Sequence, residues 1–418
     1  MSTPRVVVGA SHAGAELALR LRKHDPSQSV LLLGDESTPP YQRPPLSKTW
    51  MADPKAVPEV LLQRNVLAYE SAGVTLRMGE RVSAIDRATK RLSLASGKSL
   101  QYHQLALATG ARVRRLSAPS SDRAEHAPNF HYLRTLSDAA RLRAQFKPGA
   151  RIAIVGGGYI GLELAATAIT SGLRVVVLEA MPRLLARVTA PELSAFYERA
   201  HRDAGVDVRT EMEVVGFEFA GSEDRVAALL CRTAAGASVT VETDVIVVGI
   251  GVVPNTELAQ AAGLAVDNGI VVDEWARTSD AEIVAAGDCT SHPVPGQPAP
   301  VRLESVPNAL EQARTAAATL CGLDQPCRGV PWFWSDQYDL KLQTVGLSRG
   351  YDTLVVRGHM DERSFCAFYL RAGRIVAVDA VNRPGDFMIA RKLVATGAAA
   401  MNEVLADRGT DLKNLLAA

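Results

Sequence analysis

Two glycine-rich turns, each lying between an apolar run and a helical segment, constrain this chain more than any other feature. The first has the letters VVVGASHAG over residues 6–14, and the second has IAIVGGGYIGLE over residues 152–163. A strand, a tight glycine turn and a helix in this order bind the pyrophosphate of a dinucleotide at the helix N-terminus. One such turn is weak evidence, because glycine turns are common. Two of them predict two bound dinucleotides, and hydride transfer between a nicotinamide and a flavin is the usual purpose of such a pair.

The chain length and the order of its apolar segments predict more than one domain. The 418 residues exceed the roughly 250–300 that a single hydrophobic core serves. A first strand–helix series has buried strands at 30–33 and 105–111, and a second series runs through residues 130–248. From residue 330 the aromatic content rises, and runs at 353–357 and 365–370 alternate as strands do. We predict an α/β fold with two Rossmann-like domains, in a glutathione-reductase-like architecture, plus a smaller α+β C-terminal domain.

Composition and cysteine spacing argue against several classes of function. A formal net charge of +1 gives no support to a nucleic-acid partner. The apolar runs are too short to span a bilayer and no signal peptide is visible, so a cytoplasmic location is expected without a membrane partner. The five cysteines lack the paired spacing of an iron–sulfur cluster or a redox disulfide, and no metal site is expected. Disulfide-reductase chemistry needs an early redox cysteine, whereas the first cysteine is Cys231.

The second fingerprint matches the dinucleotide pattern throughout. Gly156 makes the tight turn, Gly158 lets the backbone approach a pyrophosphate, and Gly161 lets the helix pack closely on the strand. Glu179 ends the next strand, 21 residues after Gly158, where a carboxylate can accept both ribose hydroxyls. A 2′-phosphate would face a like charge there, which favours NADH over NADPH. Two nearby arginines leave NADPH open as the alternative: Arg183 and Arg187.

The first fingerprint departs from the pattern because Ser11 stands at the second glycine position. Its Cβ narrows the gap to a pyrophosphate, but serine is small and its hydroxyl can donate to phosphate. The next strand ends in Asp35 and Glu36, and we expect Asp35 to bind the adenosine ribose. His12 lies in the turn, where we expect a packing or surface residue rather than a catalytic base.

Two later segments indicate that the first dinucleotide is a flavin. Residues 278–288 read as a buried strand that ends in Gly287 and Asp288, and an acid at such a strand end can bind a ribityl chain. Residues 304–313 open a long helix in which Pro307 suits the first turn. The N-terminus of this helix would supply partial positive charge to the anionic reduced isoalloxazine ring.

Three segments carry a family resemblance that covers essentially the whole chain. They are YQRPPLSK over 41–48, RLESVPNA over 302–309 and PWFWSDQY over 331–338. With the two fingerprints, they resemble the FAD-dependent ferredoxin reductases that serve bacterial oxygenases. The resemblance implies NAD contacts along 156–163 and at Glu179. It implies FAD contacts at Ala13, Asp35, Lys48, Val82, Arg134, Asp288 and Val306.

These arguments together assign the domains and the cofactor residues. We predict a discontinuous FAD-binding domain of residues 1–112 and 250–329, an NAD-binding domain of residues 113–249 and a C-terminal domain of residues 330–418. The predicted residues around the flavin are Gly9, Ser11, His12, Ala13, Gly14, Asp35, Glu36, Arg43, Lys48, Val82, Ala108, Thr109, Gly110, Arg134, Asp288, Glu304, Ser305, Val306 and Trp334. Those around NADH are Gly156, Gly158, Tyr159, Ile160, Gly161, Glu163, Glu179, Arg187 and Gly251.

The resemblance also implies the catalytic pair. In such reductases a lysine lies beside the flavin and pairs with a glutamate of the second fingerprint, and Lys48 and Glu163 match these positions. A cation there favours the anionic reduced flavin and helps it to receive a hydride. The alternatives are a solvated loop lysine and a glutamate on an ordinary helix face. For Trp332 and Trp334 the alternatives are core aromatics or, for Trp334, a place near the flavin on the partner-facing side.

The function implied is electron transfer from NADH through FAD to a small 2Fe–2S ferredoxin that feeds a haem-thiolate monooxygenase. Other acceptors stay open, namely the ferredoxin of a ring-hydroxylating dioxygenase or a rubredoxin. A non-enzyme alternative is an NADH-sensing flavoprotein resembling apoptosis-inducing factor. Ferredoxins are acidic, so basic residues would steer a transient docking. The candidates are Arg302, Lys341 and Lys392.

Overall fold

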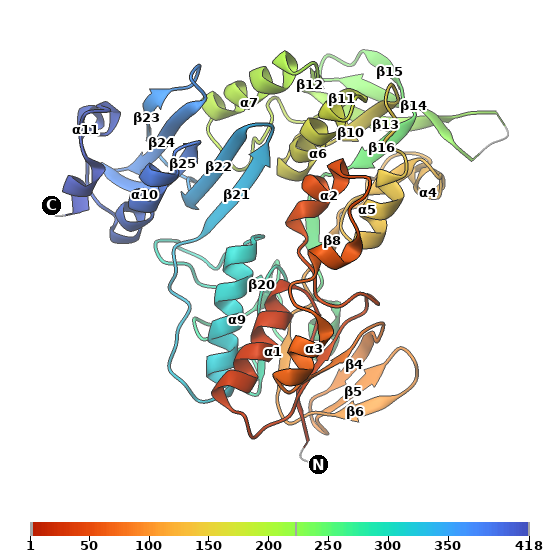
Figure 1. The fold of residues 1–418 in the computed structure, drawn as a ribbon, viewed down its shortest axis with the longest axis vertical. Coiled ribbons are helices and arrows are strands. Elements are labelled where there is room, and N and C mark those ends of the chain that lie inside the picture. The colour runs from red at the N-terminus through yellow and green to blue at the C-terminus, as the bar shows by residue number, and fades with distance from the viewer. Residues whose placement is uncertain (1–2, 222–223, 417–418) are drawn as a thin grey trace. The chain divides into compact units, whose positions relative to one another are not determined.

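The computed structural model describes residues 3–221 and 224–416, which form two compact units (Figure 1). The first unit takes Met1–Gln42, Pro58–Arg112 and Val253–Phe333. The second takes Arg43–Val57, Val113–Val252 and Trp334–Ala418. The segment Arg43–Val57, which contains Lys48, thus groups with the second fingerprint. The division into three domains stays a prediction.

A five-stranded parallel sheet forms the centre of the first unit. Its strands run in the order β19-β7-β1-β2-β3, and they are β1 (Arg5–Val8), β2 (Val30–Leu33), β3 (Val74–Arg77), β7 (Leu105–Leu107) and β19 (Ile283–Ala285). Nearly all of these residues are apolar, as is usual where a parallel sheet is covered on both faces. On one face α1 (His12–His24) and α9 (Val306–Leu320) pack against each other and against Val7 and Leu32.

The other face of this sheet packs on a small antiparallel sheet and a short helix. The antiparallel strands are β4 (Val82–Asp86), β5 (Arg91–Leu94) and β6 (Ser99–Gln101), and the helix is α8 (Glu257–Ala261). Val6 and Leu31 from the parallel sheet join Leu92 from β5 and Ala259 from α8 in one buried cluster. Both faces of the sheet are therefore covered by apolar side chains.

The second unit repeats this plan. Its parallel sheet has the order β12-β11-β10-β16-β9, with β9 (Phe130–Tyr132), β10 (Arg151–Val155), β11 (Arg174–Leu178), β12 (Asp207–Arg209) and β16 (Val245–Val248). Helix α6 (Tyr159–Thr170) follows the central strand as α1 follows β1. A second antiparallel trio covers one face: β13 (Met212–Phe219), β14 (Val226–Thr233) and β15 (Ser238–Glu242). Read in opposite directions, the two sheets match at four of five positions, because β7, β1, β2 and β3 correspond to β16, β10, β11 and β12. The fifth strand differs, since β19 comes last in its series and β9 comes first.

The rest of the second unit contains a separate antiparallel sheet and its helices. The sheet order is β21-β22-β25-β24-β23, from β21 (Trp332–Gln337), β22 (Leu340–Gly346), β23 (Thr353–His359), β24 (Ser364–Arg371) and β25 (Arg374–Val381). Helix α10 (Pro384–Thr396) packs on β25 and β22, and α11 (Asn402–Ala406) packs on β23 (Figure 1). The remaining helices of this unit are α2 (Thr49–Ala52), α4 (Ser121–Glu125), α5 (Leu136–Arg143) and α7 (Pro191–Asp203).

The other short elements are α3 (Val66–Ser71), β8 (Ala111–Val113), β17 (Val252–Pro254), β18 (Ile270–Val271) and β20 (Thr290–Ser291), with 3-10 turns at Pro44–Ser47, Pro58–Leu61 and Leu412–Leu416. The predicted fold class is confirmed. Two expected strands are shorter than predicted. The 105–111 strand ends at Leu107 because the chain turns through Gly110, whose φ is +64°. The 278–288 strand covers only Ile283–Ala285, because the amide of Ile283 turns back onto the carbonyl of Asp280.

No helix in 3–221 or 224–416 is both long enough and apolar enough to cross a membrane. The same residues contain no group of three or more histidine, cysteine or acidic side chains arranged to hold a metal ion.

Candidate functional site

The first glycine turn has the close approaches that a dinucleotide fold requires. Gly9 has a φ of +109°, and a Cβ there would lie 2.1 Å from the carbonyl oxygen of Ala108. A Cβ on Gly14 would lie 1.8 Å from the oxygen of Gly9, so only glycine lets α1 pack this closely on the turn. Ser11 is the N-cap of α1, and its carbonyl accepts the first helical bond from the amide of Ala15 at 2.9 Å. The serine therefore leaves the strand–turn–helix geometry intact.

Acidic and polar groups at this turn have defined partners. His12 is buried, and its Nε2 lies 2.9 Å from Oε1 of Gln42, as a packing residue would. Glu36 accepts a hydrogen bond from the hydroxyl of Tyr41 at 2.7 Å. Asp35 is exposed just beyond the end of β2. Of the two acids, Asp35 has the side chain that solvent or a ribose can reach.

The turn after β7 is held by Asn255, which sequence reasoning did not identify. The hydroxyl of Thr109 donates to the Asn255 carbonyl at 2.7 Å, and the Asn255 side-chain amide donates to the Thr109 carbonyl at 2.8 Å. The amide of Asn255 also donates to the carbonyl of Gly110 at 2.9 Å. These three hydrogen bonds fix the predicted Ala108–Gly110 segment. The sequence did not reveal the role of Asn255, because it lies 146 positions from Thr109.

A buried donor without a partner marks the turn at Gly287 and Asp288. The side-chain oxygen of Gln312 accepts from the Gly287 amide at 2.7 Å and from the Thr290 hydroxyl at 2.8 Å. Gln312 is 1% exposed, and its Nε2 has no hydrogen-bond partner in the described residues. Leaving such a donor unpaired costs about 1–3 kcal/mol. A ligand with carbonyl and hydroxyl acceptors, as a flavin with its ribityl chain has, fits this position.

The start of α9 has the cap that the sequence predicted. Ser305 is the N-cap and its hydroxyl accepts from the amide of Asn308, while Val306 and Pro307 form the first turn. Glu304 pairs with Arg302 at 2.5 Å, and the Arg302 side chain is only 12% exposed. Arg302 is therefore poorly placed for a docking patch. The other two candidates, Lys341 and Lys392, are exposed.

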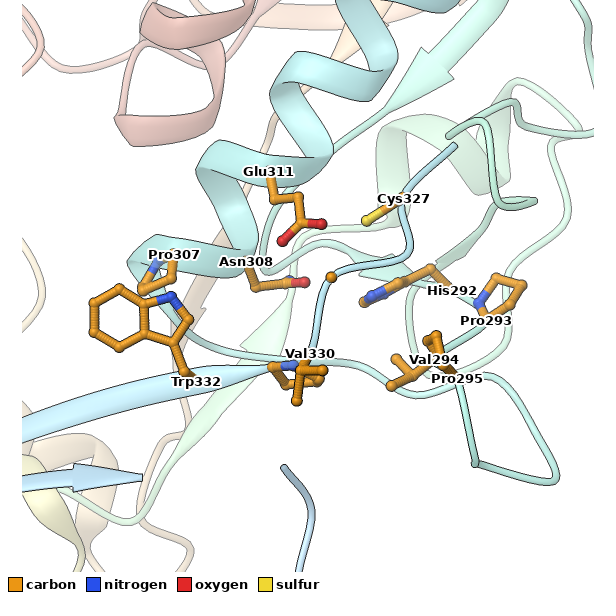
Figure 2. Close-up of a pocket in the computed structure, with 12 residues that line it drawn as sticks. His292, Pro293, Val294, Pro295, Pro307, Asn308, Glu311, Cys327, Val330 and Trp332 are labelled. Atoms are coloured by element: carbon orange, nitrogen blue, oxygen red, sulfur yellow. The ribbon is translucent and has the colours of Figure 1, made fainter. Parts of the chain in front are cut away.

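A small pocket beside α9 is too small to hold either cofactor (Figure 2). Its volume is about 10 Å³, enough for about one water molecule. His292, Glu311 and Cys327 line it, and burial lowers the pKa of His292 to about 4. Nδ1 of His292 is buried without a partner in the described residues, which a single water would satisfy.

The second glycine turn reproduces the first and adds open space. Gly156 has a φ of +110°, and a Cβ there would lie 2.5 Å from the oxygen of Gly249. A Cβ on Gly161 would lie 2.2 Å from the oxygen of Gly156. At Gly158, by contrast, a Cβ would meet no atom within 4 Å. The chain leaves room at Gly158 that packing does not use, which is what an approaching pyrophosphate requires.

The groups that face this turn fit a nicotinamide dinucleotide. The Glu179 carboxylate accepts from the amides of Gly157 at 2.6 Å and Met181 at 2.8 Å. A carboxylate has about four acceptor positions, so two remain for ribose hydroxyls. Ile160, an apolar residue in the first turn of α6, is 44% exposed. Burial raises the pKa of the neighbouring Tyr159 well above its ordinary value, so its hydroxyl stays protonated.

The two arginines that left NADPH open differ in the structure. Arg183 donates to the carbonyls of Thr189 and Ala186 and to the hydroxyl of Ser194, so its guanidinium is occupied by the loop. Arg187 is exposed and lies against Gly251, where an added Cβ would be 3.4 Å from Nη2. Only Arg187 of this pair is accessible to a phosphate.

The segment Arg43–Val57 brings a lysine onto α6. Nζ of Lys48 lies 2.9 Å from Oε2 of Glu163, and the two side chains are 16% and 4% exposed. The hydroxyl of Ser47 donates to the same oxygen at 2.6 Å, and that of Ser335 donates to Oε1 at 2.7 Å. The hydroxyl of Thr167 fixes the segment by donating to the carbonyl of Ser47 at 2.9 Å. The structure thus joins Lys48 and Glu163 in a buried ion pair, and their catalytic role stays a prediction.

The other predicted flavin contacts divide between the two units. Ala13, Val82 and Ala108 are buried in the first unit. In the second unit Arg43 donates to the carbonyl of Arg134 at 2.7 Å, and Trp334 is half-buried on β21. Their contacts with a flavin stay predictions.

The cysteines have no partners with which to form a redox disulfide. All five are free thiols, and three of them are buried: Cys231, Cys289 and Cys366. Burial raises the pKa of Cys231 to about 11 and that of Cys366 to about 12. The nucleophilic thiolate is therefore scarce at neutral pH.

Comparison with known proteins gives the family. Residues 3–313 match the pyridine nucleotide-disulphide oxidoreductase family and residues 332–416 match the reductase C-terminal family. Putidaredoxin reductase CamA of Pseudomonas putida is 45% identical over 413 residues, which cover 99% of this chain and 96% of that protein. Rhodocoxin reductase of Rhodococcus erythropolis is 43% identical and covers 99% and 94%.

A solved structure extends this likeness to three dimensions. The crystal structure of the covalent putidaredoxin reductase–putidaredoxin complex superposes with a TM-score of 0.94 at 44% identity, covering 100% of this chain and 98% of that chain. The resemblance inferred from the sequence motifs is confirmed by these matches. The protein is accordingly a member of the pyridine nucleotide-disulphide oxidoreductase family, and its residues 332–416 belong to the reductase C-terminal family.

Proposed function

We propose that the protein is an NADH-dependent flavoprotein reductase that passes electrons through FAD to a small 2Fe–2S ferredoxin. One observation carries the proposal: the chain has two dinucleotide turns but, in the described residues, no pair of cysteines placed to form a redox disulfide, so we expect electrons that arrive from NADH to leave to a partner. Putidaredoxin reductase and rhodocoxin reductase align with nearly the full length of this chain, and their names support a ferredoxin as that partner.

The first unit would hold FAD. The turn at Gly9 and the N-terminus of α1 would bind its pyrophosphate, and exposed Asp35 would accept from the adenosine ribose. Asp288 and the unpaired amide of Gln312 would meet the ribityl end. When bound, FAD accepts two electrons from NADH as a hydride and releases them one at a time to a one-electron acceptor.

The second unit would bind NADH and supply the charge near the reaction. The open space at Gly158 admits the pyrophosphate, and the Glu179 carboxylate orients the ribose and repels a 2′-phosphate. Lys48 provides a positive charge that is shielded from water, and Glu163 holds it in place. A shielded, pre-oriented cation stabilises developing negative charge more than a solvated one does.

The acceptor would dock transiently through electrostatic steering, for which exposed Lys341 and Lys392 are candidates. We propose a cytoplasmic location, and as the final electron acceptor a haem-thiolate monooxygenase served by the ferredoxin. A ring-hydroxylating dioxygenase ferredoxin or a rubredoxin are the alternative acceptors.

The test is reduction of cytochrome c by the purified FAD-loaded protein with NADH, with and without a 2Fe–2S ferredoxin. We expect cytochrome reduction that depends on ferredoxin and is faster with NADH than with NADPH. Replacing the ferredoxin by a rubredoxin distinguishes the acceptors. A long-lived complex with NADH that does not turn over with any acceptor would contradict the proposal and favour an NADH sensor.

A further inference from the structure

A line of buried polar side chains continues from Glu163 on the side away from Lys48. Ser335 and Gln337 lie two residues apart on β21, so they share a face of the strand, and both are at most 1% exposed. The hydroxyl of Ser335 lies 2.7 Å from Oε1 of Glu163, and Nε2 of Gln337 lies 3.2 Å from the same hydroxyl. Polar groups this deeply buried are costly unless each has a partner.

The line then passes to α7 and ends at the β21–β22 turn. Oε1 of Gln337 lies 2.9 Å from Nε2 of His201, which is fully buried. Nδ1 of His201 lies 2.9 Å from the hydroxyl of Tyr338, and the two rings are 5.1 Å apart. Five side chains thus form one continuous chain of hydrogen bonds: Glu163, Ser335, Gln337, His201 and Tyr338.

The direction of every bond follows from the carboxylate. Glu163 can only accept, so Ser335 gives its single proton to it and must accept from the Gln337 nitrogen. The Gln337 oxygen therefore faces His201, whose Nε2 must carry the proton. Burial lowers the pKa of His201, so the ring is neutral and its Nδ1 accepts from Tyr338. Each donor in the chain points toward Glu163.

A polarised chain of this kind orients a carboxylate but does not conduct protons. The amide of Gln337 has no proton that it can release readily, so it interrupts any relay between His201 and Ser335. What the chain supplies is a fixed donor on Oε1, opposite the ion pair that Lys48 makes with Oε2. Without this donor, the Glu163 carboxylate would be held only through Oε2, by Lys48 and Ser47.

Tyr338, the last residue in this series of hydrogen bonds, has an unfavourable backbone conformation. Tyr338 has a φ of +55°, in the left-handed region that a bulky side chain rarely adopts. It also lines a cavity of about 500 Å³ together with Phe196, Arg199 and Met360. Strain of this kind persists only where the surrounding contacts require it.

We propose that Ser335, Gln337, His201 and Tyr338 are positioning residues that fix the Glu163 carboxylate and, through it, the Lys48 ammonium. This inference rests on the proposed function for the role of Lys48. Removing Ser335, the donor nearest to Glu163, should lower the rate of flavin reduction most. The loss should become smaller for residues further along the series of hydrogen bonds.

The bonding directions are tested by NMR of the FAD-loaded protein labelled with ¹⁵N-histidine. We expect His201 to be neutral, with its proton on Nε2, between pH 5.5 and 8, about the range in which an ordinary histidine titrates. Assignment uses the spectrum of the His201→Asn variant. A proton on Nδ1, or a titration at the ordinary histidine pKa, would overturn the proposed chain.

The functional part is tested by anaerobic stopped-flow reduction of the FAD-loaded protein with NADH, without ferredoxin. Ser335→Ala should lower the limiting rate about tenfold, as loss of a hydrogen bond to a charged group does, and leave the half-saturating NADH concentration unchanged. Tyr338→Phe should lower it about twofold to threefold. Tyr197→Phe is the matched control, because that buried hydroxyl on α7 has no partner in the described residues.

The outcomes separate the two proposals. Equal limiting rates for Ser335→Ala and the unmodified protein, or equal losses in Tyr338→Phe and Tyr197→Phe, would refute the positioning role. A protein whose flavin NADH reduces but which transfers nothing to any ferredoxin would refute the proposed function and leave the positioning role standing. A change in half-saturating NADH alone would assign these residues to binding and also refute the inference.

Discussion

The two dinucleotide units place a glutamate at the same position and use it differently. Glu16 and Glu163 each lie two residues after the last glycine of their turn, on α1 and α6. Glu16 is 18% exposed and joins Arg20 on its own helix to Arg314 on α9, each at 2.9 Å. Glu163 is 4% exposed and joins Lys48 from another segment. One scaffold position therefore joins two helices in the first unit and belongs to a candidate site in the second.

The partners explain the difference. Arg20 and Arg314 belong to the helices that cover the first sheet. Lys48 and Ser335 come from segments outside the repeated strand–helix series, Arg43–Val57 and the chain after 333. The duplicated sheets supply a carboxylate at a helix position, and the added segments bury it and give it donors. The candidate chemistry therefore arises from the parts that the two units do not share.

The largest effect is expected from removing Lys48, because in the described residues the equivalent glutamate of the first unit pairs with arginines and not with a lysine. Lys48→Ala should slow reduction of the bound flavin by NADH about 100-fold, because it removes a shielded cation near developing charge. FAD content should stay unchanged, since the dinucleotide turn of the first unit is untouched. The measurement is stopped-flow flavin reduction. Lys55→Ala, an exposed lysine of the same segment, is the control, and equal rates in the two variants would refute the role of Lys48.

The equivalent glutamates give the next largest contrast. Glu163→Gln should slow flavin reduction about 30-fold, because Lys48 loses the charged partner that orients it in a buried place. Glu16→Gln should change the rate less than about twofold, because its two arginine partners are partly exposed and such surface pairs contribute little. The same stopped-flow assay compares them. Similar rates in both variants would show that the two positions do not differ in function.

The third contrast concerns Gly158, the residue that we predict to lie at the pyrophosphate. Gly158→Ser makes the second turn like the first, and it should raise the KM for NADH about tenfold because its side chain fills the space left for phosphate. The melting temperature should not change, since a Cβ there meets no protein atom within 4 Å. Ser11→Gly is the reciprocal variant and should keep its FAD. An unchanged KM would show that this space is not used.

The smallest effect is the pH dependence of the Glu16 pair. Burial opposes ionisation, but Arg314 and Arg20 more than compensate and hold the pKa of Glu16 below its ordinary value of 4.5. A lowered pKa adds stability above the unfolded-state value, and this is lost as the pH falls through the folded-state value. Against Glu16→Gln, the pair should be worth at most about 1 kcal/mol at pH 7, which is about 1 °C in melting temperature for a chain of this length. The difference should shrink below about pH 4.5, and a constant difference down to pH 3 would contradict this account.

Much of the fold could be predicted because its signals are local. A strand, a glycine turn and a helix lie within a dozen residues of each other, so VVVGASHAG and IAIVGGGYIGLE were sufficient to predict both sheets. The Lys48–Glu163 contact came only from the family resemblance. Spacing in the sequence does not predict this contact, because the two residues are far apart in the chain. Ser47, the residue before Lys48, lies 116 positions from Glu163.

The chain of hydrogen bonds beyond Glu163 could not be predicted, for a physical reason. Ser335, Asp336 and Gln337 are three consecutive polar residues on β21, so nothing in the sequence marks the face of Ser335 and Gln337 as buried rather than exposed to solvent. Here that face is the buried one, because His201 on α7 and Glu163 on α6 supply polar partners. Burial of polar groups depends on partners that lie far away in the sequence, and hydrophobic patterning does not encode them.

The buried thiols can report local opening of the structure. Cys289 lies in the first unit, whereas Cys231 and Cys366 lie in the second, and burial raises the pKa of each thiol. A thiol-alkylating reagent will modify each of them only when its surroundings open, so the rate of modification measures that opening. Peptide mapping after timed exposure to the reagent would therefore give the rate of local opening around each buried cysteine, separately for the two units.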